Sequence, residues 1–306
     1  MIDDIVNELF LTIISNLDQV DITVFAHSSK KIRHRILNQK LKLLDKTTFI
    51  NSAAMKGYLN IIRWAKLNGC IINEKVTASA ARGGHIEILK WMHENNYPFN
   101  EETCSGAALG GQLNTLKWLQ EKGCEAGAST CANAALGGHL DLLIWLNTNY
   151  CPWDERSCSN AASGGHFGVL WWLRNERMHQ PCRLLKSVHK CPWNASTCGQ
   201  AARKNHLDIL IWARSNGCSW DSTAWVYAGI NCHLDILKYL HKHGCPYYSS
   251  IIITICQRAA ILGRLDILIW AQSNGFLYLD KSICEHAKSN NHQDILDWAR
   301  LNNFPE

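Results

Sequence analysis

The chain reads AALGGHLDLLIWL from Ala134 to Leu146, and variants of this stretch recur along most of its length. Residues 107–119 read AALGGQLNTLKWL, which places the same pattern 27 positions earlier. Its aromatic position, the landmark aromatic, is filled in turn by Trp64, Trp91, Trp118, Trp145, Trp172, Trp212, Tyr239, Trp270 and Trp298. The intervals between them are 27 residues four times, then 40, 27, 31 and 28. A fixed period in this range is typical of repeat architectures. We therefore expect about nine units of 27 residues in 46–306, with an insertion near 178–190.

Each unit predicts a hairpin of two short helices. The first carries Thr-Cys-x-x-Ala-Ala, as in 130–135, and alanine combines high helix propensity with close packing. Glycines and a histidine at 137–139 end it, and the apolar positions of 140–146 follow the spacing of a second helix. One hairpin cannot bury its own apolar side, but stacked hairpins share a continuous core. The predicted fold class is an all-α solenoid of helical hairpins.

Several recurring residues fit the ends of these helices. Asp141, Asp208, Asp235 and Asp266 lie just inside the second helix, where negative charge complements the helix dipole. A glycine that suits a left-handed cap follows this helix at Gly69, Gly123, Gly217, Gly244 and Gly275. We expect the landmark aromatics to lie in the core, and Gln293 makes the last unit polar, as a solvent-facing end requires.

Composition narrows the environment and the partners. The net charge of +5 is spread along the chain, and Glu101, Glu102 and Asp154 interrupt any basic stripe, so we do not expect a nucleic-acid partner. No run of about 18 apolar residues suggests a membrane span. Acidic residues near the N-terminus disfavour a secretory signal, so we expect a cytoplasmic protein. The basic cluster at 30–35 leaves the nucleus open.

Fourteen cysteines and fourteen histidines suggest metal or redox chemistry, but their register favours packing. Cysteine alternates with Tyr97 or Phe276 six residues after the landmark aromatic, and with Ile50 or Trp225 fourteen residues before it. A position that accepts these residues is filled for volume, and a free thiol behaves as a small apolar group. The chain has no Cys-x-x-Cys pair of the kind that zinc sites use.

Six histidines share one place, six residues before the landmark aromatic: His85, His139, His166, His206, His233 and His292. We expect a hydrogen-bonding role in the turn between the two helices. Nothing outside the repeat pattern suggests a convergent catalytic triad or a phosphate-binding loop. We therefore predict no catalytic residue, no metal site and no cofactor.

The repeats resemble the ankyrin family, in the short form abundant in proteins of amoeba-infecting giant DNA viruses. The resemblance rests on segments close to Ala-Ala-x-x-Gly-His-Leu-Asp-Ile-Leu, seen at 201–210 and 259–268, and spans about 85% of the chain. Two features depart from the family. Its usual period is about 33 residues, and its Thr-Pro-Leu-His motif is replaced by Thr-Cys, as at Thr103-Cys104. The resemblance implies a binding module that lacks the β-hairpin finger and uses its concave helix surface.

Residues 1–45 form a separate segment that resembles an F-box. Ile5, Glu8 and Leu9 match the start of that motif, although Val6 replaces its usual proline. Leu17 closes a first predicted helix, Asp21 and Ile22 open a second, and 30–32 supply the basic and apolar end. The resemblance implies docking on a Skp-type adaptor through Leu9, Ile13, Leu17 and Ile22. A plain helical cap on the first repeat would give the same pattern, so both interpretations stay open.

Other candidate contacts lie outside the landmark positions. Trp153, Trp193 and Trp220 occupy turns between repeats, where they either cover the next repeat or anchor a partner. The insertion carries Arg183 and Lys186 and forms either a binding loop or a tolerated excursion. The resemblances imply two alternative functions. The chain is expected to be a substrate receptor of a Skp/cullin ubiquitin ligase, acting in a host cell if it is viral, or a scaffold or blocker that binds a host protein without any ligase.

Overall fold

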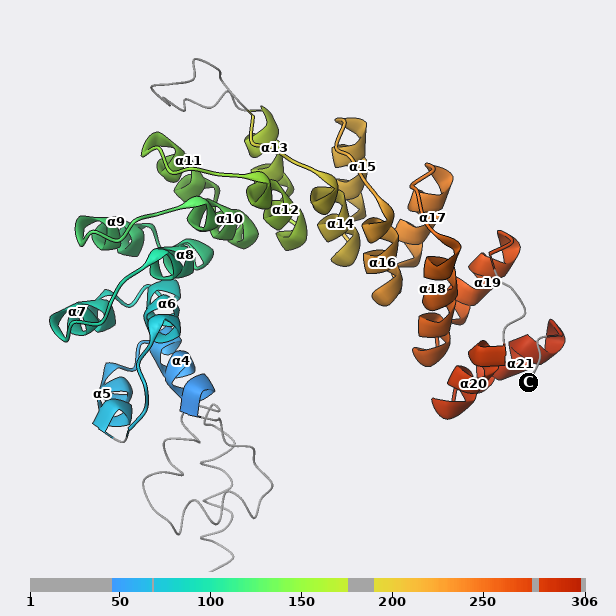
Figure 1. Ribbon diagram of the computed structural model, residues 1–306, viewed down its shortest axis with the longest axis horizontal. Coiled ribbons are helices and arrows are strands. Elements are labelled where there is room, and N and C mark those ends of the chain that lie inside the picture. The colour runs from blue at the N-terminus through green and yellow to red at the C-terminus, as the bar shows by residue number, and fades with distance from the viewer. Residues whose placement is uncertain (1–45, 68, 176–189, 277–280, 304–306) are drawn as a thin grey trace, which may run out of the picture. The chain divides into compact units, whose positions relative to one another are not determined.

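The computed structural model describes residues 46–67, 69–175, 190–276 and 281–303, and these residues form eighteen α-helices and no strand (Figure 1). The helices follow one another as hairpins, so the predicted all-α helical-hairpin solenoid is confirmed. The chain divides into two compact units, 1–134 and 135–306, and the division falls within helix α10 (Ala128–Gly137). The predicted boundary at residue 45 remains a prediction, because residues 1–45 lie outside the described part.

Unit 1 stacks three complete hairpins and the beginning of a fourth. The first helices of these hairpins pack on one another in chain order, and each second helix packs on the first helix of its own hairpin. The three hairpins are α4 (Lys46–Lys56) with α5 (Leu59–Leu67), α6 (Glu74–Arg82) with α7 (Ile86–Glu94), and α8 (Glu101–Leu109) with α9 (Leu113–Glu121).

Unit 2 repeats the same arrangement. After α11 (Leu140–Thr148), its hairpins are α12 (Glu155–Gly164) with α13 (Phe167–Asn175), α14 (Ala195–Arg203) with α15 (Leu207–Ser215), α16 (Ser222–Ile230) with α17 (Leu234–Lys242), α18 (Ser249–Ile261) with α19 (Leu265–Ser273), and α20 (Lys281–Ser289) with α21 (Gln293–Leu301). The first helices again form a contacting row. Within each unit they are therefore more closely spaced than the second helices (Figure 1).

The core of each hairpin lies between its two helices. The alanine pair of the first helix is fully buried, as at Ala80 and Ala81, and it faces aliphatic residues of the second helix such as Ile88, Leu89 and Met92. Burying one such aliphatic side chain contributes about 1.5–3 kcal/mol. Because alanine lacks a long side chain, the first helices can approach their neighbours on both sides.

Polar residues define where the first helices begin. The side chains of Asn73, Asn100, Asp154, Asn194 and Asp221 each accept a hydrogen bond from a backbone N–H of the first turn. Such a cap is worth about 1 kcal/mol, because the first N–H groups of a helix have no partner within it. The caps thus fix the start of each hairpin at the same place in the repeat.

The predicted ends of the second helix are confirmed. The four aspartates predicted at its start lie in the first turn of α11, α15, α17 and α19. The five predicted glycine caps have φ between +69° and +83°. Asn96 and Tyr150 take the same register with φ of 59° and 60°, so the left-handed turn is kept where the glycine is absent.

The landmark aromatics are less buried than the sequence predicted. Trp270 is buried with 9% of its surface exposed, but the other landmark aromatics are only half-buried. Four of them pack edge to face on an aromatic ring of the preceding turn: Trp118, Trp172, Trp212 and Tyr239. The residues on either side of them, such as Leu116 and Leu119 beside Trp118, form the core instead.

Candidate interaction surface

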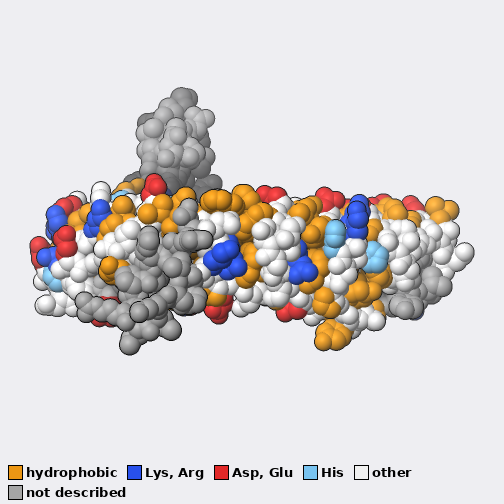
Figure 2. Space-filling view, turned by 90° about the horizontal axis from the view of Figure 1, so that it is seen from above, with side chains coloured by type: hydrophobic (Ala, Val, Ile, Leu, Met, Phe, Trp, Pro, Cys, Tyr) orange, Lys and Arg blue, Asp and Glu red, His pale blue; other side chains and the backbone are white. Residues whose placement is uncertain are grey.

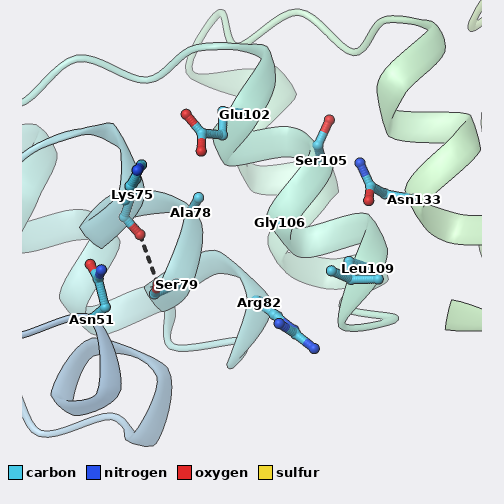
Figure 3. A pocket seen from close by; sticks show the side chains of 10 residues that line it. All are labelled: Asn51, Lys75, Ala78, Ser79, Arg82, Glu102, Ser105, Gly106, Leu109 and Asn133. Atoms are coloured by element: carbon cyan, nitrogen blue, oxygen red, sulfur yellow. Dashed lines mark hydrogen bonds between the residues drawn. The ribbon is translucent and has the colours of Figure 1, made fainter. Parts of the chain in front are cut away.

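A groove crosses the first helices of unit 1 (Figure 3). It has a volume of about 380 Å³ and is lined by residues of α4, α6, α8 and α10. The lining residues are Asn51, Lys75, Ala78, Ser79, Arg82, Glu102, Ser105, Gly106, Leu109 and Asn133. We refer to it as the polar groove, because seven of these ten residues carry polar or charged side chains.

Small residues form the floor of the polar groove. A Cβ atom added to Gly106 would lie 2.3 Å from the carbonyl oxygen of Ala78, so α6 and α8 are in backbone contact there. The hydroxyl oxygens of Ser105 and Ser129 lie 2.9 Å apart, which joins the next pair of helices. The close approach therefore depends on residues with little or no side chain at the crossing points.

Charged side chains stand at the rim. Lys75 and Arg82 are exposed on α6, seven residues and thus about 10 Å apart along the helix. Glu102 is exposed on α8 beside them (Figure 3). Among the described residues none of these three makes an ion pair, so their charges remain available to a ligand.

Side-chain amides add hydrogen-bonding capacity at both ends of the groove. The Nδ2 atom of Asn133 donates to the carbonyl oxygen of Ser129 at 2.9 Å, and the Oδ1 atom takes no part in this hydrogen bond. The Oδ1 atom of Asn51 is buried and accepts no hydrogen bond within the described chain. Amides of this kind can both donate to and accept from a peptide backbone. The polar groove can thus bind polar and charged groups, and no nucleophile paired with a base lies in it.

The turn tryptophans pack on the hairpin that follows them. Trp153 contacts Trp172 edge to face with ring centroids 6.3 Å apart, and Trp193 contacts Trp212 in the same way at 5.9 Å. Trp220 lies 6.1 Å from Tyr239. All three rings are half-buried. This geometry accords with the covering role, while the role of these tryptophans as partner anchors stays a prediction.

Arginines stack on two of these tryptophans. The Cζ atom of Arg174 lies 3.9 Å from the ring centroid of Trp193, and that of Arg214 lies 4.1 Å from Trp220. Each guanidinium also donates to a carbonyl of the same turn, at Cys191 and Cys218 respectively. The charge is thereby held over the ring face, which carries the negative part of the aromatic quadrupole.

The insertion leaves the repeat geometry at its base unchanged. The N–H of Cys191 donates to the carbonyl of Leu173 at 3.1 Å, which is the bond that Cys151 makes with Leu146 in a repeat without an insertion. The predicted contacts Arg183 and Lys186 lie outside the described residues. The predicted adaptor contacts Leu9, Ile13, Leu17 and Ile22 also lie outside them.

The described cysteines are free thiols, and all of them except the half-buried Cys70 are buried. The Sγ atoms of Cys124, Cys218 and Cys245 lie 3.0–3.4 Å from the carbonyl oxygen of a preceding N-cap residue. Burial raises the pKa of both Cys245 and Cys256 to about 12, because the thiolate would lose its hydration. Within the described ranges no group of three or more His, Cys, Asp or Glu residues could hold a metal ion.

Four turn histidines form a hydrogen bond to the preceding hairpin, and for these four the predicted hydrogen-bonding role is confirmed. Nε2 lies 2.9–3.1 Å from the carbonyl oxygen that ends the preceding first helix in the pairs His85–Met55, His166–Leu136, His233–Arg203 and His292–Ile261. Because a carbonyl only accepts, Nε2 carries the proton. Arg264 replaces histidine in one repeat and donates to the carbonyl of Cys232 at 2.8 Å.

The distribution of charged side chains on one face of the molecule can be compared with the expectation of no nucleic-acid partner (Figure 2). Figure 2 shows Lys and Arg side chains as separate spots among hydrophobic and uncharged ones on that face. The visible described residues there form no continuous basic stripe of the kind that follows a phosphate backbone. None of the described helices is long and apolar enough to cross a membrane.

Comparison of this chain with known proteins gives matches among solved structures. No family model matches it, and no curated protein matches it. Solved structures do match, including the ankyrin repeat domain of human ASB11, with 19% sequence identity and a TM-score of 0.36 over 56% of this chain and 84% of that one. Another is the pentatricopeptide repeat protein PPR10 in complex with an 18-nt psaJ RNA element, with 11% identity and a TM-score of 0.28. That match covers 92% of this chain, which spans about half (53%) of the PPR10 chain.

The site has features that the sequence pattern did not single out. The residues of the polar groove were not predicted, because small and polar residues on the solvent-facing side of the first helices belong to no named motif. A signal was present in the repeat register: Ser52, Ser79, Gly106, Asn133 and Asn160 are all small or polar at one position, twelve residues before the landmark aromatic. A surface position without large residues in successive repeats indicates a continuous groove.

Proposed function

We propose that the chain is a non-catalytic protein-binding module that acts as a substrate receptor of a Skp/cullin ubiquitin ligase. The observation that carries its binding role is the polar groove, where Lys75, Arg82 and Glu102 have no ionic partner among the described residues. These three unpaired charges do not stabilise the chain through ion pairs, and a target protein with opposite charges could pair with them.

The receptor role adds the N-terminal segment to this binding surface. Its resemblance to an F-box supports docking on a Skp-type adaptor through Leu9, Ile13, Leu17 and Ile22. The first helices then hold the target, and Trp153, Trp193, Trp220, Arg183 and Lys186 are further candidate contacts in the sequence. Ubiquitin transfer is carried out by other subunits, so this chain needs no catalytic residue.

The decisive experiment is a pull-down of a purified Skp-type adaptor by the full-length chain. A Leu9→Asp, Ile13→Asp variant places two charges on the apolar stripe and should lower adaptor binding by at least about tenfold, since interface anchors lose more than about 1 kcal/mol when disrupted. An Asn16→Asp, Gln19→Asp variant adds the same charge at polar positions of the segment and should bind like the unchanged chain.

The alternative is a scaffold or blocker that binds a protein without any ligase. An intact, folded chain that retains no adaptor would rule out the receptor role and leave this alternative. Equal loss of binding in the apolar and the polar variants would contradict docking through the apolar stripe, because net charge would then control adaptor binding.

A further inference from the structure

Unit 2 has a second groove of different chemistry on its first helices. It lies between α16 and α18 and has a volume of about 270 Å³. Its walls are formed mainly by Val226, Ile230, Ile251 and Ile255, with Gly229 at the floor and Arg258 at the rim. We call it the apolar groove. Ile230 is 49% exposed.

The apolar groove differs from the two repeats before it, although four other repeats keep an apolar residue at the position of Ile230 (Met55, Leu109, Leu136 and Ile261). The positions of Val226 and Ile230 are filled by Gly199 and Arg203 in the preceding repeat, and by serines at 159 and 163 in the one before. Neighbouring repeats thus show that polar or small residues suffice for the fold at both positions. Ile230 is exposed, Val226 and Ile251 are half-buried and Ile255 is buried, so the groove offers a small apolar surface that one inserted side chain could cover.

A lengthened helix builds one wall. α18 has 13 residues, whereas α14 and α16 have nine. The extra turn at its start supplies Ser250 and Ile251 to the groove. A Cβ atom on Gly229 would lie 2.2 Å from Cγ1 of Ile255, so the glycine allows α18 to lie directly on α16 at the floor. The two helices therefore meet at the floor and leave the space between them open above it.

The other wall is anchored in the core. Trp225, next to Val226, is completely buried in a position where most repeats carry cysteine. Its Nε1 donates to the carbonyl oxygen of Cys245 at 3.1 Å, and its ring lies 5.0 Å from that of Tyr247. A wall held in this way is preorganised, so a ligand that enters the groove loses little free energy to ordering the protein.

Size and charge indicate the occupant. Pockets for small-molecule ligands usually measure about 300–1,000 Å³, so the apolar groove suits one or two side chains better than a cofactor. Arg258 is exposed at its rim and makes no ion pair among the described residues. An aliphatic or aromatic side chain with a carboxylate close by in the sequence would complement both features.

We propose that the apolar groove is the anchor site for the target protein, and that it takes a bulky apolar side chain from a segment that also presents Asp or Glu to Arg258. This inference rests on the proposed function, since it assumes that the first helices bind a protein. It adds the chemistry of the recognised segment, which is apolar and acidic.

The test is selection of a random 12-residue peptide phage library on the full-length chain. Enriched peptides should combine Leu, Ile, Met, Phe or Trp with an acidic residue within about four positions. Ile230→Arg introduces the residue found at 203 in a sibling repeat, and it should weaken these peptides at least about tenfold, a loss of about 1.4 kcal/mol. Val226→Ser and Arg258→Glu should also weaken them.

The matched control is Ile269→Lys on α19. Ile269 is 47% exposed, and its register carries Lys90, Lys117 and Lys238 in other repeats, so the variant removes a similar apolar surface outside the groove. It should leave peptide affinity within about twofold. Circular dichroism of each variant establishes that the helices are retained.

Two results would overturn the inference, and they separate it from the proposed function. Peptides that bind tightly but respond to Lys75→Glu, Arg82→Glu and not to Ile230→Arg would leave a protein-binding module with its anchor in the polar groove. A selection that enriches no peptide, or only peptides without an apolar residue, would exclude the apolar groove as an anchor and leave adaptor binding to be judged by its own pull-down.

Discussion

The Nε2 atom of His85 lies 2.9 Å from the carbonyl oxygen of Met55, thirty residues earlier in the chain. Met55 is near the end of α4, where the last carbonyls of a helix have no partner within it. The ring also lies over Gly57, where an added Cβ would come within 2.7 Å of it. The His85 side chain therefore connects the turn of its own hairpin to the end of α4, the first helix of the preceding hairpin.

Replacing a bridging histidine should loosen the contact between two hairpins. His166→Ala removes the bond to the carbonyl of Leu136 and leaves that oxygen without this donor, which should cost about 1–3 kcal/mol. His166→Gln introduces the residue that another repeat carries at 112, where the amide donates to Gly110 of its own turn, so glutamine should not restore the bridge. The midpoint of urea unfolding measures both changes. Equal midpoints for the alanine variant and the unchanged chain would show that the bond does not stabilise the stack.

Two glycines within helices should respond to alanine with opposite signs. Alanine in place of a helical glycine usually stabilises by about 0.5–1 kcal/mol. At Gly168 of α13 nothing lies within 4 Å of the added Cβ, so Gly168→Ala should raise the free energy of unfolding by that amount. At Gly106 of α8 the Cβ would lie 2.3 Å from the Ala78 carbonyl oxygen, so Gly106→Ala should lower it by about 1–3 kcal/mol.

Urea unfolding of the two variants provides the measurement, and each serves as the control for the other. A stabilising effect at both positions would contradict the close approach of α6 and α8. Such a result would also place the floor of the polar groove elsewhere, because Gly106 lines it.

The repeat pattern predicted the hairpins well and the contacts between them poorly. A period of 27 residues and the spacing of 140–146 fix which residues share a helix face, so the helices and their glycine caps follow from sequence alone. The bridge from His166 does not follow, since its partner is a backbone carbonyl that leaves no trace in the residue type at 136. Side-chain periodicity reports the direction of a residue and says little about its depth, which is why Trp118 was expected in the core.

The apolar groove shows a second limit of sequence reasoning. The interval of 31 residues before Trp270 indicates about four additional residues in that repeat. Nothing in the interval says that they lengthen α18 instead of forming a loop. The wall that contains Ile251 arises because the added residues continue the helix, and this depends on the packing of Ile255 over Gly229.

The free energy of unfolding should decrease at high pH, in part because the buried thiol of Cys256 resists ionisation in the folded chain. The pKa of Cys256 is raised by burial from an ordinary value of 9.0 to about 12 in the folded chain. Below pH 9 the thiol is protonated in both states and its full contribution is present. Between pH 9 and 12 only the unfolded state loses the proton, so the free energy of unfolding should decrease by up to about 1.4 kcal/mol per pH unit.

The comparison that isolates this effect is the unchanged chain against Cys256→Ala, both kept reduced. Other groups also titrate in this range, so each chain will lose stability, but the variant should lose less between pH 9 and pH 11. Parallel stability curves for the two chains would mean that the thiol of Cys256 ionises as readily in the folded state as in the unfolded one.

Removing a turn tryptophan should reveal whether it covers the repeat. Trp193 contacts Trp212 and lies under Arg174, so Trp193→Ala should lower the free energy of unfolding by about 1–3 kcal/mol through lost packing and cation–π attraction. Ala126 fills the equivalent register in another repeat, so the variant should still fold. Tyr150→Ala is the control, because Tyr150 is 65% exposed and should change stability by less than about 0.5 kcal/mol. If both variants unfold at the same urea concentration, the packing role of Trp193 is excluded and the role of a partner anchor remains.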